Sequence, residues 1–479
     1  MRLMTITTFL AAYASLAMGQ TFSAFLSRVN SVPNAERPAI VDSFMTAVPG
    51  FPYIEETMQV HFLYRGPANS AQVPGDMNGW TPSAANMTQI SGTDLWYYSR
   101  FFEADARLDY KYVLNGSNWI LDPRNPYTVT GGFGPNSELR MPEFVQPPEI
   151  ENYPDVAQGA IRDTMFTSSV MGNTRRVRIY TPPGYENSGQ SYPLLLVHDG
   201  LEFITLARCE RVLNYLIHHN QIRPLIAVFV PPVDRTPEYA GDRQDEFGQF
   251  ITTELLPFVD SAYRTDSDPQ NRGTMGSSNG GNIALWLGVT FPETFGQVIA
   301  FSSNVEQNIT AVLEQNDDLP LRFYLDIGTY DIPVLIPRVQ GLVQILENQE
   351  YPYFYQEIHD GHSWGNWRGH IDDALRFTFP STTEAPEGVV LPVSFKLAQN
   401  YPNPFNPTTT IELALQERMY VSLDVFDTTG RLVESLANGM YDIGNHEFVF
   451  NGTQLPTGSY LARVVANGRV SAIRMILVK

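Results

Sequence analysis

Gly276-Ser277-Ser278-Asn279-Gly280 lies where a predicted strand, Arg272 to Met275, meets a predicted helix that is established by Asn282. The pentapeptide matches G-x-S-x-G, in which the glycines leave room for a sharp turn that holds a serine in strained backbone geometry. A strand, a tight turn and a helix in this order are typical of a parallel sheet covered by helices. The segment therefore predicts an α/β region with Ser278 at the end of a strand.

Strand and helix patterns alternate on both sides of this turn, over residues 155–380. The apolar runs Pro193–Val197 and Leu225–Val230 are continuous, as in strands buried on both faces of a parallel sheet. Phe247 to Val259 and Asn282 to Val289 have the spacing of helices. Residues 155–380 are therefore expected to form an α/β domain with a mostly parallel sheet.

Regions of short alternating strands flank the α/β domain. Residues 58–145 contain alternating runs such as Val60–Tyr64 and Leu108–Val113, separated by turn signals, and are expected to form a small β-sandwich. Residues 20–57 have helical spacing and form a predicted helical lead-in. Residues 381–395 have the composition of a linker, and residues 396–479 return to alternating strands. The sequence thus predicts a multidomain protein.

Residues 1–19 have the pattern of an export signal. Arg2 precedes the apolar stretch Leu3–Leu16, and Ala17-Met18-Gly19 offers small residues for cleavage. The stretch is too short for a membrane span, and nothing later reaches about 18 uninterrupted apolar residues. We therefore expect a secreted protein with no membrane span.

Composition excludes several classes of protein. The formal net charge of −20 argues against a nucleic-acid partner, which requires clustered positive charge. Cys209 is the single cysteine, so an intramolecular disulfide and a multi-cysteine metal site are excluded. An exported protein without disulfides suggests a bacterial envelope or medium.

Chain order narrows the residues that could work with the serine. Hydrolases with this turn run serine, acid, histidine, which favours His359 or His362 as the base. The acid should follow a strand between the two. Asp331 lies on the loop after such a strand, where it could fix the histidine tautomer, whereas Asp326 lies within the strand. Asp331 is therefore favoured.

Other ordered motifs accompany the serine turn between about Arg162 and Pro380. They are Tyr192–Gly200, Arg235 with Glu238-Tyr239, Glu254–Pro257, and Gly361-His362-x-Trp364-x-x-Trp367-Arg368. Together they resemble the esterase branch of the α/β-hydrolases, which includes enterochelin esterase, feruloyl and acetylxylan esterases and the mycolyltransferase antigens.

This resemblance implies roles for individual residues. Ser278 would be the nucleophile, His362 the base and Asp331 the acid, while the backbone N–H groups of Leu201 and Asn279 would form the oxyanion hole. It also gives candidate substrate-binding residues, which are Trp364, Trp367, Arg235 and Glu202. No cofactor or metal is expected, because His359-Asp360-Gly361-His362 is accompanied by no third ligand.

The sequence departs from the family pattern at two points. Asp360 replaces the glycine that is usual before Gly361-His362, and Ser277-Ser278-Asn279 replaces the commoner x-Ser-Met. These changes are expected to alter the floor of the pocket and to leave the catalytic roles intact.

Residues 58–145 resemble the glycogen-binding type of carbohydrate-binding module, an early-set immunoglobulin-like fold. The matching stretches are Val73–Trp80, Tyr110–Gly116 and Leu121–Pro123. Trp80, Trp96 and Trp119 are candidates for stacking on sugar rings. The alternative is that they fill the sandwich core or the interface with the esterase domain.

The C-terminal region resembles the sorting domain of the type IX secretion system, an immunoglobulin-like β-sandwich. The matching stretches are Asn400–Pro407, Phe426–Arg431, Leu455–Tyr460 and Met475–Lys479. This implies a bacterium of the Bacteroidetes kind and an export address that the secretion machinery reads and cleaves at the outer membrane.

Together these patterns predict a secreted serine carboxylic-ester hydrolase that removes feruloyl or acetyl groups from plant polysaccharide or its fragments. An ester-decorated carbohydrate or an aryl ester would be the substrate. The first alternative is a siderophore esterase of the enterochelin type. The second is a surface carbohydrate-binding protein with an inactive esterase fold.

Overall fold

The computed structural model describes residues 21–48, 50–55, 58–381, 395–415, 419–427, 431–466 and 469–479. The predicted signal peptide and most of the predicted linker lie outside these residues. The chain divides into two compact units, residues 1–385 and 386–479.

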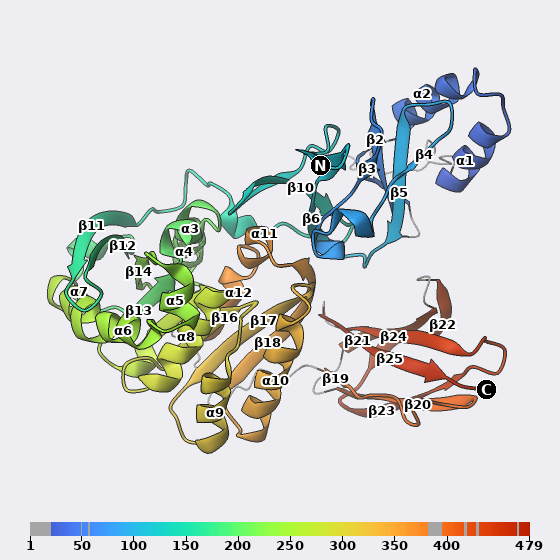
Figure 1. The fold of residues 1–479 in the computed structure, drawn as a ribbon. Helices are drawn as coiled ribbons and strands as arrows, with labels where there is room; N and C mark the ends of the chain where they lie inside the picture. Colours follow the sequence, from blue (N-terminus) through green and yellow to red (C-terminus); the bar gives the residue numbers. More distant parts are fainter. Residues whose placement is uncertain are drawn as a thin grey trace, which may run out of the picture. The chain divides into compact units, whose positions relative to one another are not determined.

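An eight-stranded sheet forms the centre of the α/β region (Figure 1). Its strands run parallel from β14 to β18, whereas β11 and β12 are antiparallel at one edge. The sheet is therefore mixed, and its larger part is parallel as predicted. In spatial order the strands are β11 (Ala160–Ser168), β12 (Asn173–Thr181), β14 (Ile226–Val230), β13 (Leu194–His198), β15 (Arg272–Ser277), β16 (Gln297–Phe301), β17 (Arg322–Tyr330) and β18 (Tyr353–Gly361).

Helices cover both faces of this sheet. Alternate residues of a buried strand point to opposite sides, so each strand contributes to two cores. Leu194 and Leu196 pack in one core, and Leu195 and Val197 pack in the other. The first core includes residues of α5 (Arg235–Ala240), α6 (Gln244–Gln249), η5 (Phe250–Leu255), α7 (Leu256–Ala262), α8 (Asn279–Thr290), α9 (Gln307–Gln315) and α10 (Leu335–Asn348). The second includes residues of α3 (Gly200–Thr205), α4 (Cys209–His218), α11 (Trp364–Trp367) and α12 (Ile371–Thr378). Cys209 is a buried member of the second core.

The N-terminal region of the same unit is rich in sheet and begins with helices α1 (Phe22–Asn30) and α2 (Arg37–Ala47). Its three sheets have the orders β1-β2-β5-β4, β6-β10-β9 and β3-β7-β8. The strands are β1 (Tyr53–Ile54), β2 (Gln59–Arg65), β3 (Ala71–Gln72), β4 (Thr88–Gln89), β5 (Leu95–Phe101), β6 (Arg107–Tyr110), β7 (Tyr112–Leu114), β8 (Asn118–Ile120), β9 (Thr128–Gly131) and β10 (Gly134–Arg140). Phe62, Tyr110 and Tyr112 are fully buried in the core between these strands.

The C-terminal unit consists of two antiparallel sheets with the orders β19-β20-β23 and β22-β21-β24-β25. Alternating residues such as Val421, Leu423 and Val425 form its core. The strands are β19 (Phe395–Leu397), β20 (Thr408–Leu415), β21 (Met419–Asp427), β22 (Leu432–Tyr441), β23 (Gly444–Asn451), β24 (Gly458–Ala466) and β25 (Arg469–Leu477). Within the described ranges, no helix has the length and apolarity to cross a membrane.

Candidate active site

Ser278, Asp331 and His362 each follow the last residue of a strand, since β15 ends at Ser277, β17 at Tyr330 and β18 at Gly361. These strands are parallel, so their carboxyl ends lie at one edge of the sheet, where α/β proteins bind ligands. The topology therefore brings together three side chains that are far apart in the sequence.

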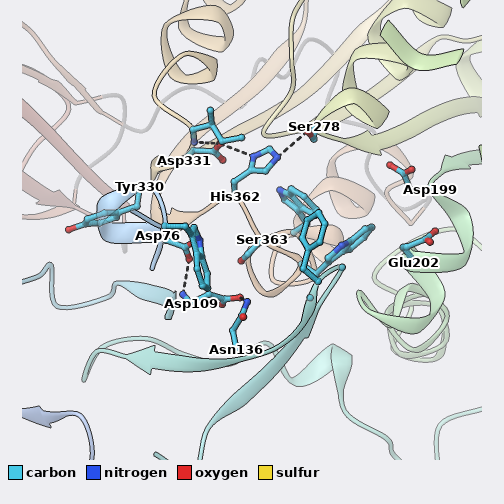
Figure 2. A pocket seen from close by; sticks show the side chains of 18 of the residues that line it. Asp76, Asp109, Asn136, Asp199, Glu202, Ser278, Tyr330, Asp331, His362 and Ser363 are labelled. Atoms are coloured by element: carbon cyan, nitrogen blue, oxygen red, sulfur yellow. Dashed lines mark hydrogen bonds and ion pairs between the residues drawn. The ribbon is translucent and has the colours of Figure 1, made fainter. Parts of the chain in front are cut away.

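These three side chains form a hydrogen-bonded chain (Figure 2). Nδ1 of His362 lies 2.8 Å from Oδ1 of Asp331, and Nε2 lies 3.0 Å from Oγ of Ser278. Asp331 is buried, and the backbone N–H of Ile332 also donates to its Oδ1, at 2.6 Å. A carboxylate on Nδ1 favours the tautomer whose Nε2 can accept the serine proton.

The serine turn has the strained geometry that its glycines predict. Ser278 has φ +57° and ψ −122°, a conformation that L-residues rarely adopt. A Cβ atom at Gly276 would overlap the backbone of Gly280 one turn later. A Cβ atom at Gly280 would lie 2.7 Å from a carboxylate oxygen of Asp199. Close packing on both sides of the serine therefore requires glycine at both positions.

The structure distinguishes between the two histidines, and between the two acids, that chain order left as alternatives. His359 lies within β18, and its Nδ1 is 2.7 Å from Oδ1 of Asp105 in the N-terminal region. Asp326 lies inside β17, where it accepts a backbone hydrogen bond from Ser302. Ser278 is thus hydrogen-bonded to His362, and His362 is hydrogen-bonded to Asp331.

Leu201 and Asn279 both lie in the first turn of a helix. α3 begins at Gly200 and α8 begins at Asn279, and the first N–H groups of a helix have no acceptor within it. Such N–H groups favour negative charge near them. Both residues are therefore placed where a backbone N–H group is available, while their role toward an oxyanion stays a prediction.

Arg235 connects the segments that precede these two helices. Its guanidinium binds the Asp199 carboxylate through two hydrogen bonds of 2.8 and 2.7 Å and donates to the Ser277 carbonyl at 3.2 Å. Asp199 precedes α3 with φ +49°, and its backbone N–H donates to the Tyr239 hydroxyl. Arg235 also lines the cavity described next, but most of its donors are committed to the protein.

A cavity of about 820 Å³ opens beside Ser278 and His362, between the α/β region and the N-terminal region (Figure 2). The α/β region contributes the predicted substrate-binding residues Trp364, Trp367, Arg235 and Glu202. Trp367 is buried, and its ring lies edge-on to His362 with 5.0 Å between ring centroids. The N-terminal region contributes the opposite wall, which includes Asp76, Trp80, Asp109, Lys111, Trp119, Phe133 and Asn136.

The three tryptophans proposed for sugar stacking have different positions. Trp80 and Trp119 line the cavity, and Trp119 is 46% exposed. Trp96 is only 7% exposed and packs in the N-terminal core, so it presents no open face to a sugar ring. For Trp96 the structure thus supports the core-filling alternative.

Apart from Trp80 and Trp119, sequence reasoning missed the residues of the N-terminal wall of the cavity. Phe133 is fully exposed between β9 and β10, in the turn Gly131-Gly132-Phe133-Gly134. An aromatic residue among glycines in a hairpin turn is a weak signal that could have drawn attention to it. Nothing in the local sequence places Asp76 or Lys111 in the same cavity as Ser278, which lies more than 160 positions later in the chain.

The departure at Asp360 also involves the N-terminal region. Oδ1 of Asp360 accepts hydrogen bonds from Nη1 of Arg107, at 2.8 Å, and from the backbone N–H of Gly361, at 2.7 Å. Burial raises the pKa of Asp360 to about 7, and the charge of Arg107 opposes this shift. The carboxylate thus has a buried cationic partner on a different part of the chain.

His198, at the end of β13, is a buried histidine outside the chain of three. Its Nε2 lies 2.9 Å from Oγ1 of Thr274, and burial lowers its pKa to about 3. The unfolded state binds a proton near pH 6.5 and the folded state does not, so acidification favours unfolding. Between pH 7.5 and 5, wild type should lose about 2 kcal/mol more unfolding free energy than His198→Gln.

Urea unfolding of the α/β region at both pH values measures this difference. His219→Gln, at an exposed position, is the matched control and should keep the wild-type pH dependence. An equal loss of stability in wild type and His198→Gln would contradict the prediction.

Known proteins resemble two parts of the chain. Residues 168–378 match the family described as "Putative esterase", and residues 399–479 match the family described as "Secretion system C-terminal sorting domain". The iron(III) enterobactin esterase of Escherichia coli K12 is 24% identical over 369 residues, which cover 67% of this chain and 91% of the relative.

Two further proteins extend this comparison. The endo-1,4-beta-xylanase/feruloyl esterase of Xylanibacter ruminicola is 25% identical over 154 residues, covering 30% of this chain and 21% of the relative. The crystal structure of the enterobactin esterase from Shigella flexneri, in the presence of enterobactin, has a TM-score of 0.57 and 24% identity. The matched region covers 67% of this chain and 92% of the Shigella flexneri protein, so the two proteins share a fold.

The family match indicates an esterase domain at residues 168–378, and the solved structure shows that the fold is shared. The second match, at residues 399–479, is to a C-terminal sorting domain and points to export by a secretion system. The predictions of an esterase domain and of a sorting domain are thus confirmed. The carbohydrate-binding module stays a prediction.

Proposed function

We propose that the protein is an exported serine esterase in which Ser278 is the nucleophile, His362 the general base and Asp331 the group that orients the histidine. The observation that carries this proposal is the hydrogen-bonded chain from Asp331 through His362 to Ser278, at 2.8 and 3.0 Å. A nucleophile bonded to a base that a carboxylate orients is the arrangement that acyl transfer requires.

In the proposed reaction, Nε2 of His362 takes the proton from Oγ of Ser278 as this oxygen attacks the ester carbonyl carbon. The N–H groups of Leu201 and Asn279 stabilise the oxyanion that forms. His362 then donates the proton to the departing alcohol, which leaves an acyl-serine. Water, activated by the same histidine, releases the acid and restores Ser278.

The proposed substrate is a feruloyl or acetyl ester on plant polysaccharide or its fragments. Trp80, Trp119, Phe133 and Trp364 line the cavity and offer flat apolar faces on which an aromatic acyl group or a sugar ring could stack. The relative that carries a xylanase and a feruloyl esterase supports this substrate class. Export through the sorting domain supports a substrate outside the cell.

The charges of the cavity also favour a neutral ester over a strongly anionic one. The complex that catecholates form with iron(III) carries several negative charges, and unpaired cations nearby would favour its binding. Among the described residues that line the cavity, Arg235 is paired with Asp199, Lys111 is the other cation, and Glu202 adds a negative charge. This balance is poorly suited to such an anion.

A siderophore esterase of the enterobactin type is the alternative function. The observation that favours it is the alignment with enterobactin esterase, which covers 67% of this chain and so extends beyond the esterase domain. A surface carbohydrate-binding protein with an inactive esterase fold is the non-enzyme alternative. The hydrogen-bonded set of Ser278, His362 and Asp331 weighs against it.

A side-by-side assay of four esters tests these functions. We expect the protein to hydrolyse p-nitrophenyl acetate. We also expect kcat/KM for methyl ferulate or acetylated xylan to be at least about 10-fold above that for a catecholate triester. This ratio corresponds to about 1.4 kcal/mol in transition-state binding. Preference for the triester would establish the alternative. If none of the four esters gave a product, the esterase proposal would be contradicted. The carbohydrate-binding protein would then be the remaining function.

The flanking modules complete the proposal. Residues 58–145 would be a carbohydrate-binding type of module with an early-set immunoglobulin-like fold, in which Trp80 and Trp119 are the remaining candidates for sugar stacking. Residues 396–479 would be an immunoglobulin-like address that the type IX machinery reads and cleaves. The protein would then be released to the medium or held at the outer-membrane surface of a bacterium.

A further inference from the structure

Arg107, from strand β6 of the N-terminal region, holds the loop that carries His362. Nη1 of Arg107 donates to Oδ1 of Asp360 at 2.8 Å and to Oγ of Ser363 at 3.2 Å. Asp360 in turn accepts the backbone N–H of Gly361 at 2.7 Å. One guanidinium therefore fixes residues on both sides of His362.

The loop is also shaped to receive side chains of the N-terminal region. A Cβ atom at Gly365 would overlap the guanidinium of Arg107, and a Cβ atom at Gly361 would overlap the carboxylate of Asp76. Asp76 is itself fixed, because its Oδ2 accepts the backbone N–H of Asp109 at 2.7 Å. The glycines on either side of His362 thus leave space for these two side chains.

Arg107 is held firmly enough to act as a support. It is 1% exposed, its Nε donates to Oε1 of Glu138 at 2.5 Å, and its Nη2 donates to Asp109. Glu138 is fully buried and also accepts from Arg368 of the histidine motif, at 3.4 Å. Buried ion pairs with several hydrogen bonds resist displacement, because separation would leave a buried charge without a partner.

We propose that Arg107 is a positioning residue for His362, which makes the N-terminal region part of the catalytic unit. This inference rests on the proposed role of His362 as general base. Arg107 acts through Asp360, Gly361 and Ser363, so its removal should misplace the base and slow the chemical step while a small substrate still binds.

The main test compares Arg107→Met with Arg107→Lys, using p-nitrophenyl acetate as the substrate and recording thermal unfolding of each variant. Arg107→Met should lower kcat by about 10- to 100-fold and change KM by less than about 3-fold, because misplacement of a catalytic group by about 1 Å has effects of this size. Arg107→Lys, which keeps the charge, should recover part of the loss.

Arg140→Met is the matched control. Arg140 binds the same Glu138, and its other described partners are the rings of Tyr127 and Phe144. This variant should keep wild-type kcat. An equal loss of kcat in Arg140→Met and Arg107→Met would overturn the proposal, because the effect would then be a general one on the N-terminal region.

A double-mutant cycle with Asp360→Ala shows whether Arg107 acts through the loop. Both single variants should lose kcat, and the double variant should be no more than about 3-fold slower than the slower single variant, since the two residues share one interaction. Fully multiplicative losses would overturn the proposal. If Arg107→Met does not fold, Arg107→Lys and Asp360→Ala decide, and wild-type kcat in both would overturn it.

Chemical rescue tests whether the missing guanidinium is what lowers kcat in a variant that thermal unfolding shows to be folded. A cavity of about 180 Å³ is lined by Arg107, Asp360 and Gly365 and offers a path for a small cation. Added guanidinium should raise kcat of folded Arg107→Ala, and the absence of any rise would count against the proposal. An inactive wild type would refute the proposed function instead, whereas an active wild type matched by Arg107→Met would refute only this inference.

Discussion

Replacing Ser278 with alanine is expected to lower kcat/KM for p-nitrophenyl acetate by about 10⁴-fold or more, which is the size of effect seen when a serine nucleophile is removed. The substitution removes only Oγ, the atom that lies 3.0 Å from Nε2 of His362. Alanine keeps the Cβ atom, so the strain at φ +57° and the packing of the turn are unchanged. Thermal unfolding of the variant should therefore match that of wild type.

Ser277→Ala is the matched control for this experiment. Ser277 is the neighbouring serine, is fully buried, and has a hydroxyl group with no described hydrogen-bond partner. Removing an unsatisfied buried hydroxyl group costs little stability. Ser277→Ala should keep activity, and loss of activity in Ser277→Ala together with retention in Ser278→Ala would refute the assignment of the nucleophile.

Replacing Asp331 with asparagine is expected to lower kcat by about 10³- to 10⁴-fold, because the histidine loses the carboxylate that selects its tautomer and stabilises its cation. Asparagine has nearly the same shape, and its amide oxygen can still accept the backbone N–H of Ile332. The loss should therefore appear in kcat for p-nitrophenyl acetate, with stability close to wild type.

Asp326→Asn is the matched control for Asp331. Asp326 is buried inside β17, the strand that Asp331 follows, and burial raises its pKa well above the usual range. Asp326→Asn should change kcat by less than about 3-fold, because the amide oxygen can still accept the backbone N–H of Ser302, and the hydrogen bonds of His362 are to Asp331 and Ser278. If Asp326→Asn were the inactive variant and Asp331→Asn the active one, the acid would have been assigned incorrectly.

The sequence predicted the parts of the candidate site that depend on neighbours along the chain. The turn around Ser278 could be recognised from a short motif, because the backbone atoms that exclude a Cβ atom at Gly276 belong to Gly280, only four residues later. The position of Asp331 followed from the same logic, since a residue just beyond a parallel strand lies at the ligand-binding edge.

The local sequence pattern alone could not decide between His359 and His362. Both residues belong to one short segment, and from the residues alone they were alternatives. In the fold, His359 contacts Asp105, while His362 lies just beyond the strand and contacts Ser278. The resemblance to esterases selected His362 beforehand, but only the packing of two regions explains why the other histidine is committed elsewhere.

The tryptophans of the N-terminal region illustrate the same limit. Trp96 and Trp119 both lie in short strands, yet Trp96 fills the core and Trp119 lines the cavity. Alternation predicts that successive residues face opposite sides of a strand. It does not predict which side another part of the chain will cover.

By itself, the sequence predicted the α/β class, the serine turn, the acid after its strand and the export address, because each depends on short-range geometry or on an ordered motif. Only the tertiary structure decided that the N-terminal region forms one wall of the cavity and that Arg107 reaches the histidine loop. The physical reason is that these contacts join residues far apart in the chain, such as Arg107 and Asp360, which are 253 positions apart. Their meeting depends on how two cores pack, and no local pattern records it.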